Sequence, residues 1–178
     1  YVRIDHFRAF DEYWEVPATA ETAMEGKWMP GPKADFFNVM KEELGDDLPI
    51  IAEDLGMITQ SVLDLRDQFD LPGMKILQFA FENTEDNDFL PYNYSSNSIC
   101  YTGTHDNDTS TGWYHSASEA SKDKIRRYLS TDGSHISWDM IRCAFSSVSR
   151  MAIIPIQDIF EEGSDRRMNI PGVANGNW

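Results

Sequence analysis

Acidic side chains follow an apolar or β-forming run at three places in the chain. These places are Arg3-Ile4-Asp5-His6, Ile51-Ala52-Glu53-Asp54 and Tyr101-Thr102-Gly103-Thr104-His105-Asp106. Because burying an uncompensated carboxylate is costly, strands that end this way are expected to deliver their acids to a surface cleft. Carboxylates that flank a glycosidic bond can act as nucleophile and general acid. Asp, Glu and His side chains could instead hold a divalent metal that activates water, so two chemistries are open.

The first acid, Asp5, has an arginine two positions before it. Alternate residues of a strand share a face, so the Arg3 guanidinium is expected beside the Asp5 carboxylate, where it would favour the ionised form that a nucleophile needs. A buried Arg–Asp pair that only fixes the strand end is the structural alternative. His6, taken alone, is interpreted as a core histidine.

The second pair, Glu53 and Asp54, cannot point the same way if both lie on a strand. Successive side chains face opposite sides, so one of them points into a given cleft, where it could serve as a general acid. Its neighbour would then hold loop backbone or cap the next helix. The alternative is that both carboxylates cap backbone.

The third stretch, residues 102–109, gathers short polar side chains around Gly103. This composition favours a tightly turned loop that aims His105 and Asp106 at a ligand. An Asx-rich turn that caps a helix starting near Thr109 is the alternative, and it accounts well for Asp108.

Aromatic residues are concentrated in the segments near these strand ends. Their flat rings suit the faces of sugars, which favours carbohydrate chemistry over a metal site, although packing at the rim of a cleft would use the same residues. They are Tyr13, Trp14, Trp28, Tyr92, Tyr94, Trp113 and Tyr114.

Strands and helices are expected to alternate along the chain. Strands are predicted at 1–6, 50–53, 74–81, 99–102 and 151–156, and helices at 34–44, from Thr59 to about Asp70, and at 108–115, 118–129 and 137–149. Segments 18–32 and 82–97 and the tail from Gln157 are predicted as loops. This order implies a parallel sheet, in which functional residues gather at the carboxyl ends of the strands. About five strands are too few for a closed barrel.

The composition fits a globular domain with a sizeable core. The chain has 178 residues, of which 41% are hydrophobic, and a formal net charge of −15. Such a charge argues against nucleic acid and anionic membranes as partners. Cys100 and Cys143 form no metal or disulfide pattern and are expected to be reduced, buried thiols of a cytoplasmic protein. No apolar run approaches the roughly 20 residues of a membrane helix, and no signal-peptide pattern is present.

A series of ordered motifs resembles glycoside hydrolase family 77, the 4-α-glucanotransferases or amylomaltases, which are retaining enzymes of the α-amylase clan. The resemblance covers essentially the whole chain. Its motifs are Arg3–Arg8, Tyr13–Pro17, Gly26–Trp28, Gly31–Pro32, Ile51–Gly56, Pro72–Lys75, Tyr101–Thr109, Gly112–Tyr114 and Arg167–Gly172. Two positions depart from the family pattern, because Ala9 and Lys33 stand where glycine is usual.

The resemblance implies an α/β fold that is the C-terminal portion, about strands 4 to 8, of a TIM (β/α)8 barrel. The N-terminal strands are absent, so residues 1–178 are expected to form a partial catalytic domain of a longer protein. By itself this polypeptide is expected to fold poorly or to be inactive, since an incomplete barrel leaves open strand edges.

The resemblance also implies catalytic roles. Asp5 matches the nucleophile, Arg3 the arginine that keeps it ionised, and Glu53 the general acid/base. Asp106 matches the third carboxylate, which binds sugar hydroxyls and stabilises the transition state. Asp54 is then left with a structural role in the loop before Thr59.

The substrate-binding residues implied by the same resemblance are Arg3, His105, Trp14, Asn169 and Pro171. The expected activity is transfer of α-1,4-glucan segments between maltodextrins, without a cofactor. Two alternatives stay open: a metal-dependent barrel hydrolase that uses His6, His105 and the acids, and a non-catalytic glucan-binding fragment.

Overall fold

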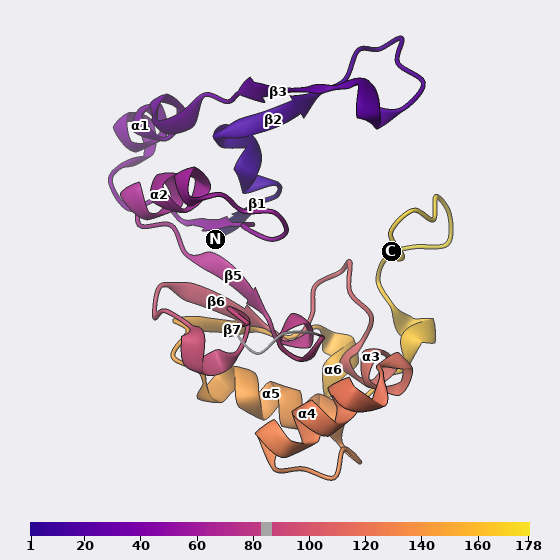
Figure 1. Ribbon diagram of the computed structural model, residues 1–178. Coiled ribbons are helices and arrows are strands. Elements are labelled where there is room, and N and C mark those ends of the chain that lie inside the picture. Colours follow the sequence, from indigo (N-terminus) through magenta and orange to yellow (C-terminus); the bar gives the residue numbers. More distant parts are fainter. Residues whose placement is uncertain (83–86) are drawn as a thin grey trace. The chain divides into compact units, whose positions relative to one another are not determined.

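The chain forms two compact units, Tyr1–Met74 (unit 1) and Lys75–Trp178 (unit 2). The computed structural model, shown in Figure 1, describes residues 1–82 and 87–178. The predicted loop 82–97 therefore includes four residues, 83–86, that lie outside the described residues. Within the same loop, Pro91–Asn93 form a short 3-10 turn, η4. No helix in the described part of the chain has both the length and the apolar character needed to cross a membrane.

Unit 1 contains a parallel strand pair that confirms two of the predicted strands. β1 (Val2–Ile4) pairs with β4 (Ile50–Ala52), with Val2 opposite Ile50 and Ile4 opposite Ala52. All three residues of β4 are buried, as expected from their apolar sequence. The pairing fixes the register of the two acid-bearing strand ends.

Two helices of unit 1 begin and end close to the predicted positions. α1 (Lys33–Leu44) is followed by Gly45, whose φ of 95° and hydrogen bond from its N–H to Lys41 O (2.9 Å) terminate the helix as a glycine can. α2 (Gln60–Gln68) begins after Thr59, but the Thr59 hydroxyl contacts Ser61 Oγ instead of capping a backbone N–H.

The core of unit 1 is built from aliphatic side chains and a phenylalanine cluster. The ring of Phe7 lies 5.8 Å from that of Phe10 and 5.5 Å from that of Phe37, centroid to centroid. These rings pack the 3-10 turn η1 (Phe7–Phe10) against α1. The buried residues are Phe7, Phe37, Leu48, Ile50, Ala52, Val62, Leu65, Phe69 and Leu71.

The prediction of a loop over 18–32 is wrong in part. β3 (Lys27–Pro30) pairs antiparallel with β2 (Glu12–Glu15), so the aromatic segments form a hairpin. The long connection, which includes the turn η2 (Ala23–Glu25), carries none of the short turn signals that identify hairpins in sequence. Neither strand alternates apolar with polar residues, because both faces of the ribbon are partly exposed.

Unit 2 is organised on the three-stranded sheet β5-β6-β7. β5 (Gly73–Ile76) begins two residues before the unit boundary, and β6 (Ser98–Tyr101) pairs parallel with β7 (Met151–Ile153). The helices between β6 and β7 are α3 (Ser110–Ser116), α4 (Glu119–Leu129) and α5 (Ile136–Ser146). The parallel order expected from alternating elements is thus confirmed for β6 and β7.

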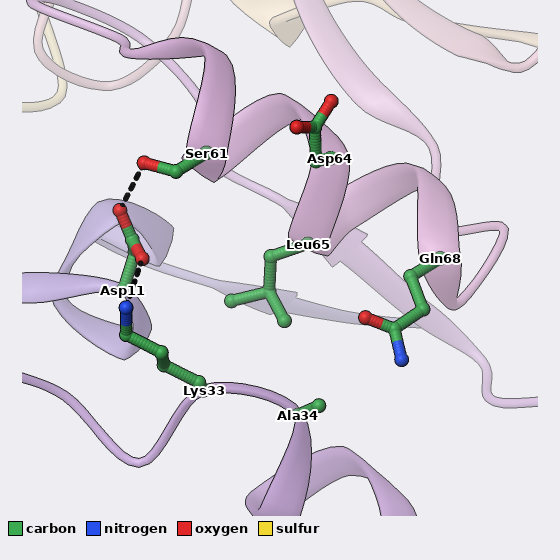
Figure 2. Close-up of a pocket in the computed structure, with 7 residues that line it drawn as sticks. All are labelled: Asp11, Lys33, Ala34, Ser61, Asp64, Leu65 and Gln68. Atoms are coloured by element: carbon green, nitrogen blue, oxygen red, sulfur yellow. Dashed lines mark hydrogen bonds and ion pairs between the residues drawn. The ribbon is translucent and has the colours of Figure 1, made fainter.

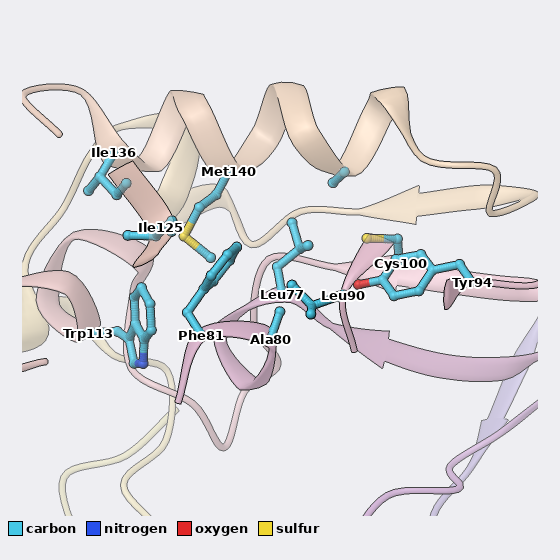
Figure 3. Close-up of a cluster of buried hydrophobic side chains, with 11 residues drawn as sticks. Leu77, Ala80, Phe81, Leu90, Tyr94, Cys100, Trp113, Ile125, Ile136 and Met140 are labelled. Atoms are coloured by element: carbon cyan, nitrogen blue, oxygen red, sulfur yellow. The ribbon is translucent and has the colours of Figure 1, made fainter. Parts of the chain in front are cut away.

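Residues 74–81 were predicted as one strand, and this prediction is wrong beyond Ile76. Leu77–Phe81 instead form the 3-10 turn η3, in which Leu77, Gln78, Ala80 and Phe81 are buried. A short run that is buried all round has no periodicity to distinguish strand from helix. In Figure 3 the Met140 side chain of α5 points toward Phe81.

Two further predictions near the C-terminal end need correction. α5 ends at Ser146 rather than Ser149, and two apolar residues of the predicted helix, Phe145 and Val148, are 68% and 59% exposed. At 100° per residue the buried arc is centred between Met140 and Ala144, which leaves Phe145 outside it. The tail from Gln157 is not all loop, because it contains most of α6 (Ile156–Ile159) and the turn η5 (Ser164–Arg166).

Candidate active site

The parallel pairing of β1 with β4 brings two predicted acids to the same level of unit 1. Ile4 is opposite Ala52, so Asp5 and Glu53 are the next residues of the two strands. Backbone bonds continue the ladder, from Glu53 N to Ile4 O (3.0 Å) and from Phe7 N to Glu53 O (3.1 Å). Both acids therefore leave neighbouring strands at their carboxyl ends, as predicted.

The Glu53 carboxylate is held by backbone N–H groups. Its Oε2 accepts from His6 N (2.7 Å) and its Oε1 from Leu55 N (3.1 Å). The His6 backbone is left-handed, with a φ of 51° that is unusual for a residue other than glycine. This backbone conformation occurs where the His6 N–H donates to Glu53. The His6 residue is exposed, so the prediction that it is a core histidine is wrong.

The predicted contact between Arg3 and Asp5 is present. Arg3 Nη2 lies 2.7 Å from Asp5 Oδ1, and the Asp5 side chain is 73% exposed. The pair is therefore not a buried ion pair of the kind weighed as the alternative. Arg3 Nε also donates to Met74 Sδ (3.3 Å).

Asp54 points away from Glu53 and braces unit 1. Its carboxylate accepts from Arg66 Nη1 (2.5 Å) and from Met74 N (2.8 Å), and only 6% of its side chain is exposed. Burial alone would lower the pKa of Arg66, but hydrogen bonds and charges of neighbouring carboxylates outweigh burial and raise it. Asp54 thus ties β4 to α2 and β5, which corrects the expectation that it fixes the loop before Thr59.

Asp106 accepts hydrogen bonds from two side chains of a distant segment of unit 2. Asn169 Nδ2 donates to Asp106 Oδ1 (2.8 Å), and Arg167 Nη2 donates to Asp106 O (3.0 Å). His105 Nε2 lies 3.3 Å from Asp106 Oδ2. The structure thus brings together three predicted site residues, and it adds Arg167, which was part of a motif but not of the predicted site.

The loop that carries Asp106 is tightly turned, as its composition predicted. Asn107 Oδ1 accepts from both Thr104 N (2.9 Å) and Thr104 Oγ1 (2.8 Å). A Cβ atom at Gly103 would lie 2.7 Å from Gln78 Nε2, so no larger residue fits without movement of Gln78. Gln78 Nε2 also donates to Asp108 O (2.8 Å) and anchors the far end of the loop.

A buried carboxylate that the sequence analysis missed lies beneath this loop. Asp158 is 1% exposed and accepts from Ser110 N (2.7 Å), Ser110 Oγ (2.8 Å) and Thr102 Oγ1 (2.5 Å). These bonds join the end of β6 and the start of α3 to α6. No sequence pattern marked Asp158, because its partners are 48 and 56 positions away.

The remaining predicted binding residues lie in two exposed segments. In unit 2, Val173 N donates to Ile170 O (3.1 Å) and Gly172 has a φ of 80°, so Pro171 and Gly172 occupy the centre of a turn with the residue pattern of type II. In unit 1, Trp14 is 39% exposed on the hairpin. Among the described residues, no group of three or more His, Cys, Asp or Glu side chains is arranged to hold a metal.

A pocket in unit 1 contains none of the predicted acids (Figure 2). Its volume is about 280 Å³. Asp11 Oδ2 accepts from Ser61 Oγ (2.5 Å), and Asp11 Oδ1 lies 3.3 Å from Lys33 Nζ. Lys33 has a φ of 50°, and it is one of the two positions at which the resemblance led us to expect glycine. The other lining residues are Ala34, Asp64, Leu65 and Gln68.

Comparison with known proteins gives consistent matches along the whole chain. The glycoside hydrolase 77 family model, described as 4-alpha-glucanotransferase, matches residues 1–178. The 4-alpha-glucanotransferase of Synechocystis sp. is 54% identical over 181 residues, covering 99% of this chain and 35% of that protein. That of Thermus thermophilus is 47% identical over 185 residues, covering 99% and 37%.

A solved structure agrees with these matches. The amylomaltase from Streptococcus agalactiae in complex with acarbose has a TM-score of 0.94 and 39% identity, over 100% of this chain and 36% of that chain. The fold is therefore a mixed α/β fold shared with amylomaltase. The chain spans about a third of the length of the curated relatives described above. From its sequence and its structure alike, the chain belongs to the glycoside hydrolase 77 family of 4-alpha-glucanotransferases.

Proposed function

We propose that the protein to which this chain belongs transfers α-1,4-glucan segments between maltodextrins, and that this chain supplies its catalytic carboxylates. Family membership over residues 1–178 supports the activity. The observation that carries the proposal is the register of β1 and β4, because it delivers Asp5 and Glu53 from neighbouring strands at one level.

The proposed reaction is a double displacement. Glu53 protonates the leaving glycosidic oxygen while the Asp5 carboxylate attacks the anomeric carbon, so the glycosidic bond breaks and a glucosyl ester of Asp5 forms. Glu53 then removes the proton of an incoming sugar 4-hydroxyl, whose oxygen displaces Asp5. Two inversions leave the configuration retained. The exposure of Asp5 and its contact with the Arg3 guanidinium support the role of an accessible nucleophile.

The proposed roles in unit 2 concern binding and charge stabilisation. Asp106 would bind sugar hydroxyls and stabilise the developing positive charge, with His105 beside it. The hydrogen bond from Asn169 supports this role, because it orients one carboxylate oxygen and leaves the residue exposed. Pro171, in the exposed turn after Asn169, would contribute to the glucan groove.

The finer fold assignment, the substrates and the cellular location are also part of the proposal. Residues 1–178 would be about strands 4 to 8 of a (β/α)8 barrel, within the catalytic domain of a longer polypeptide. The high TM-score over 36% of the matched amylomaltase supports this assignment. The proposed substrates are maltodextrins and fragments of starch or glycogen, no cofactor is proposed, and a cytoplasmic location is proposed from the two free thiols.

The deciding experiment is chain-length analysis of the products that the full-length protein makes from maltotriose. We expect glucose together with oligomers longer than the substrate, and we expect acarbose to inhibit their formation. Glucose and maltose alone would mean hydrolysis. Binding of maltodextrin without any change in chain length would identify a binding module. Loss of activity on chelation, restored by a divalent ion, would contradict the proposed mechanism.

A further inference from the structure

The segment that follows η5 in unit 2 is closed into a loop by one of its own side chains. Figure 1 shows this yellow segment folding back on itself. Asn177 Oδ1 accepts from Ile170 N (3.1 Å), and Asn177 Nδ2 donates to Val173 O (2.6 Å). A side-chain amide carries both a donor and an acceptor, as a peptide group does. Asn177 therefore bonds to both ends of the turn formed by Pro171 and Gly172.

Two glycines allow the chain to return to this turn. Gly172 and Gly176 have φ values of 80° and 82°, in the left-handed region that glycine enters without steric cost. Asn177 is partly buried, whereas residues 170–176 are exposed. The loop has few buried side chains, so hydrogen bonds such as those of Asn177 are the main contacts that fix its shape.

Both neighbours of Asn169 are bonded to the end of this loop. Met168 O accepts from Trp178 N (2.7 Å), and Ile170 N donates to Asn177 Oδ1. Asn169 therefore lies between two residues whose backbone is held by positions 177 and 178. Its own backbone has little freedom to move while these two bonds are present.

The bonds of Asn169 extend this support to the Asp106 loop. Asn169 Nδ2 donates to Asp106 Oδ1 (2.8 Å). Arg167 links the same two residues through their carbonyls, because its Nε donates to Asn169 O (3.2 Å) and its Nη2 to Asp106 O (3.0 Å). Hydrogen bonds weaken steeply when their geometry changes, so a displaced Asn169 backbone would weaken the bond to the Asp106 carboxylate.

We propose that Asn177 is a positioning residue for Asp106, and that it acts by holding Asn169 in the geometry of the Asn169–Asp106 hydrogen bond. The importance of Asp106 for turnover rests on the proposed function. Asn177 follows the last motif of the family resemblance, which ends at Gly172, and it was not among the predicted site residues.

The test is a double-mutant cycle on Asn177 and Asn169 in the full-length protein. Asn177→Ala should lower kcat/KM for maltotriose about fivefold and Asn169→Ala about tenfold, the size of effect expected for lost hydrogen bonds. The double variant should resemble Asn169→Ala, at about tenfold, because Asn177 acts through Asn169. Independent effects would instead multiply to about fiftyfold.

Asn175→Ala is the matched control. Asn175 is an exposed asparagine of the same loop, and its side chain makes no hydrogen bond within the described part of the chain. This variant should leave kcat/KM unchanged. Multiplied losses in the double variant, or full activity of Asn177→Ala or Asn169→Ala, would overturn the proposal. A lowered Tm of Asn177→Ala with unchanged kcat/KM would show that Asn177 only stabilises its own loop.

Hydrogen exchange tests the same link without relying on catalysis. In the Asn177→Ala variant, the backbone amides of residues 102–109 should exchange faster than in the wild type, because the Asp106 loop loses part of its support. The Asn175→Ala variant should show no such change. Unchanged exchange in Asn177→Ala would overturn the positioning role. Failure of the wild type to redistribute maltotriose would instead reject the proposed function, while faster exchange in residues 102–109 would still show that Asn177 holds the Asp106 loop.

Discussion

The two units position their candidate carboxylates by different means. In unit 1, strand register and backbone N–H groups hold Glu53, and the acids follow directly from β1 and β4. In unit 2, Asp106 depends on side chains that come from 61 and 63 positions away, Arg167 and Asn169. A backbone arrangement survives most side-chain substitutions, whereas a side-chain network does not. Glu53 should therefore respond mainly to its own replacement, whereas Asp106 should respond to its neighbours too.

The largest expected effect is the loss of either acid in unit 1. Asp5→Asn and Glu53→Gln, made in the full-length protein, should each lower kcat about 10³-fold or more, because each removes a group that reacts directly. Glucan binding should survive, as measured by calorimetry with maltoheptaose. Near-normal turnover in one of the variants would remove that residue from the mechanism.

The next largest effects are expected on stability, from replacing the buried carboxylate of each unit, Asp158 or Asp54. Asp158→Asn should lower the free energy of unfolding by about 2–4 kcal/mol, because an amide group would face three donors in a buried site. Asp54→Asn should cost less, about 1–2 kcal/mol, since Arg66 keeps its contact with Asp67. Urea unfolding of the full-length protein measures both. The reverse order would mean that the ion pair matters more than the buried network.

A smaller effect is expected from the neighbour of Asp106. Asn169→Ala removes the hydrogen bond to Asp106 Oδ1 and should lower kcat/KM about tenfold, the value of one bond to a charged group. Asn93→Ala is the control, because Asn93 Nδ2 also donates one bond (3.1 Å, to Asn87 O) but belongs to the turn η4 and not to the Asp106 loop. Unchanged kcat/KM in the Asn169 variant would show that Asp106 is positioned by its backbone.

The left-handed backbone of Lys33 predicts a difference in stability between two variants at this position of unit 1. Lys33→Gly and Lys33→Ala both remove the contact with Asp11, but only glycine relieves the positive φ of 50°. The glycine variant should therefore be more stable than the alanine variant by about 1 kcal/mol. Thermal unfolding of the two proteins tests this order. Equal Tm values would show that the left-handed conformation carries no cost here.

The thiols of unit 2 provide the smallest effect. Burial raises the pKa of Cys100 to about 12 and that of Cys143 to about 11, from 9.0. The contribution of the neutral thiols to the free energy of unfolding should be fully present below about pH 9. It should be lost as the pH rises toward 11 and 12. At pH 8, iodoacetamide should therefore alkylate the native protein much more slowly than the urea-unfolded protein. Equal rates would contradict burial of the thiols.

The sequence was most informative where an acidic residue directly follows a strand. Apolar residues before Asp5 and Glu53 predicted strands, and alternation predicted that Glu53 and Asp54 face different ways, which their separate partners confirm. The Arg3–Asp5 contact followed from the same two-residue spacing. These features are local, so neighbouring residues suffice to predict them.

Features that depend on distant residues could not be predicted from patterns. The link from Asp106 to Asn169 joins positions 63 apart, and only the family resemblance placed both in one site. Nothing in the sequence marked Asp158, whose role depends on Thr102 and Ser110. The hairpin was missed for another reason, since its strands do not alternate and bury neither face.

The pairing of β1 with β4 also has a consequence for the order of folding. The contact between His6 and Glu53 closes a loop of 47 positions, and the hairpin and α1 lie inside that loop. Parallel pairing over such a separation gains nothing until the intervening chain has been ordered, whereas the hairpin can form from nearby residues. We therefore expect the two acids to come together late in folding, so hydrogen exchange should protect the hairpin amides before the His6 amide during refolding.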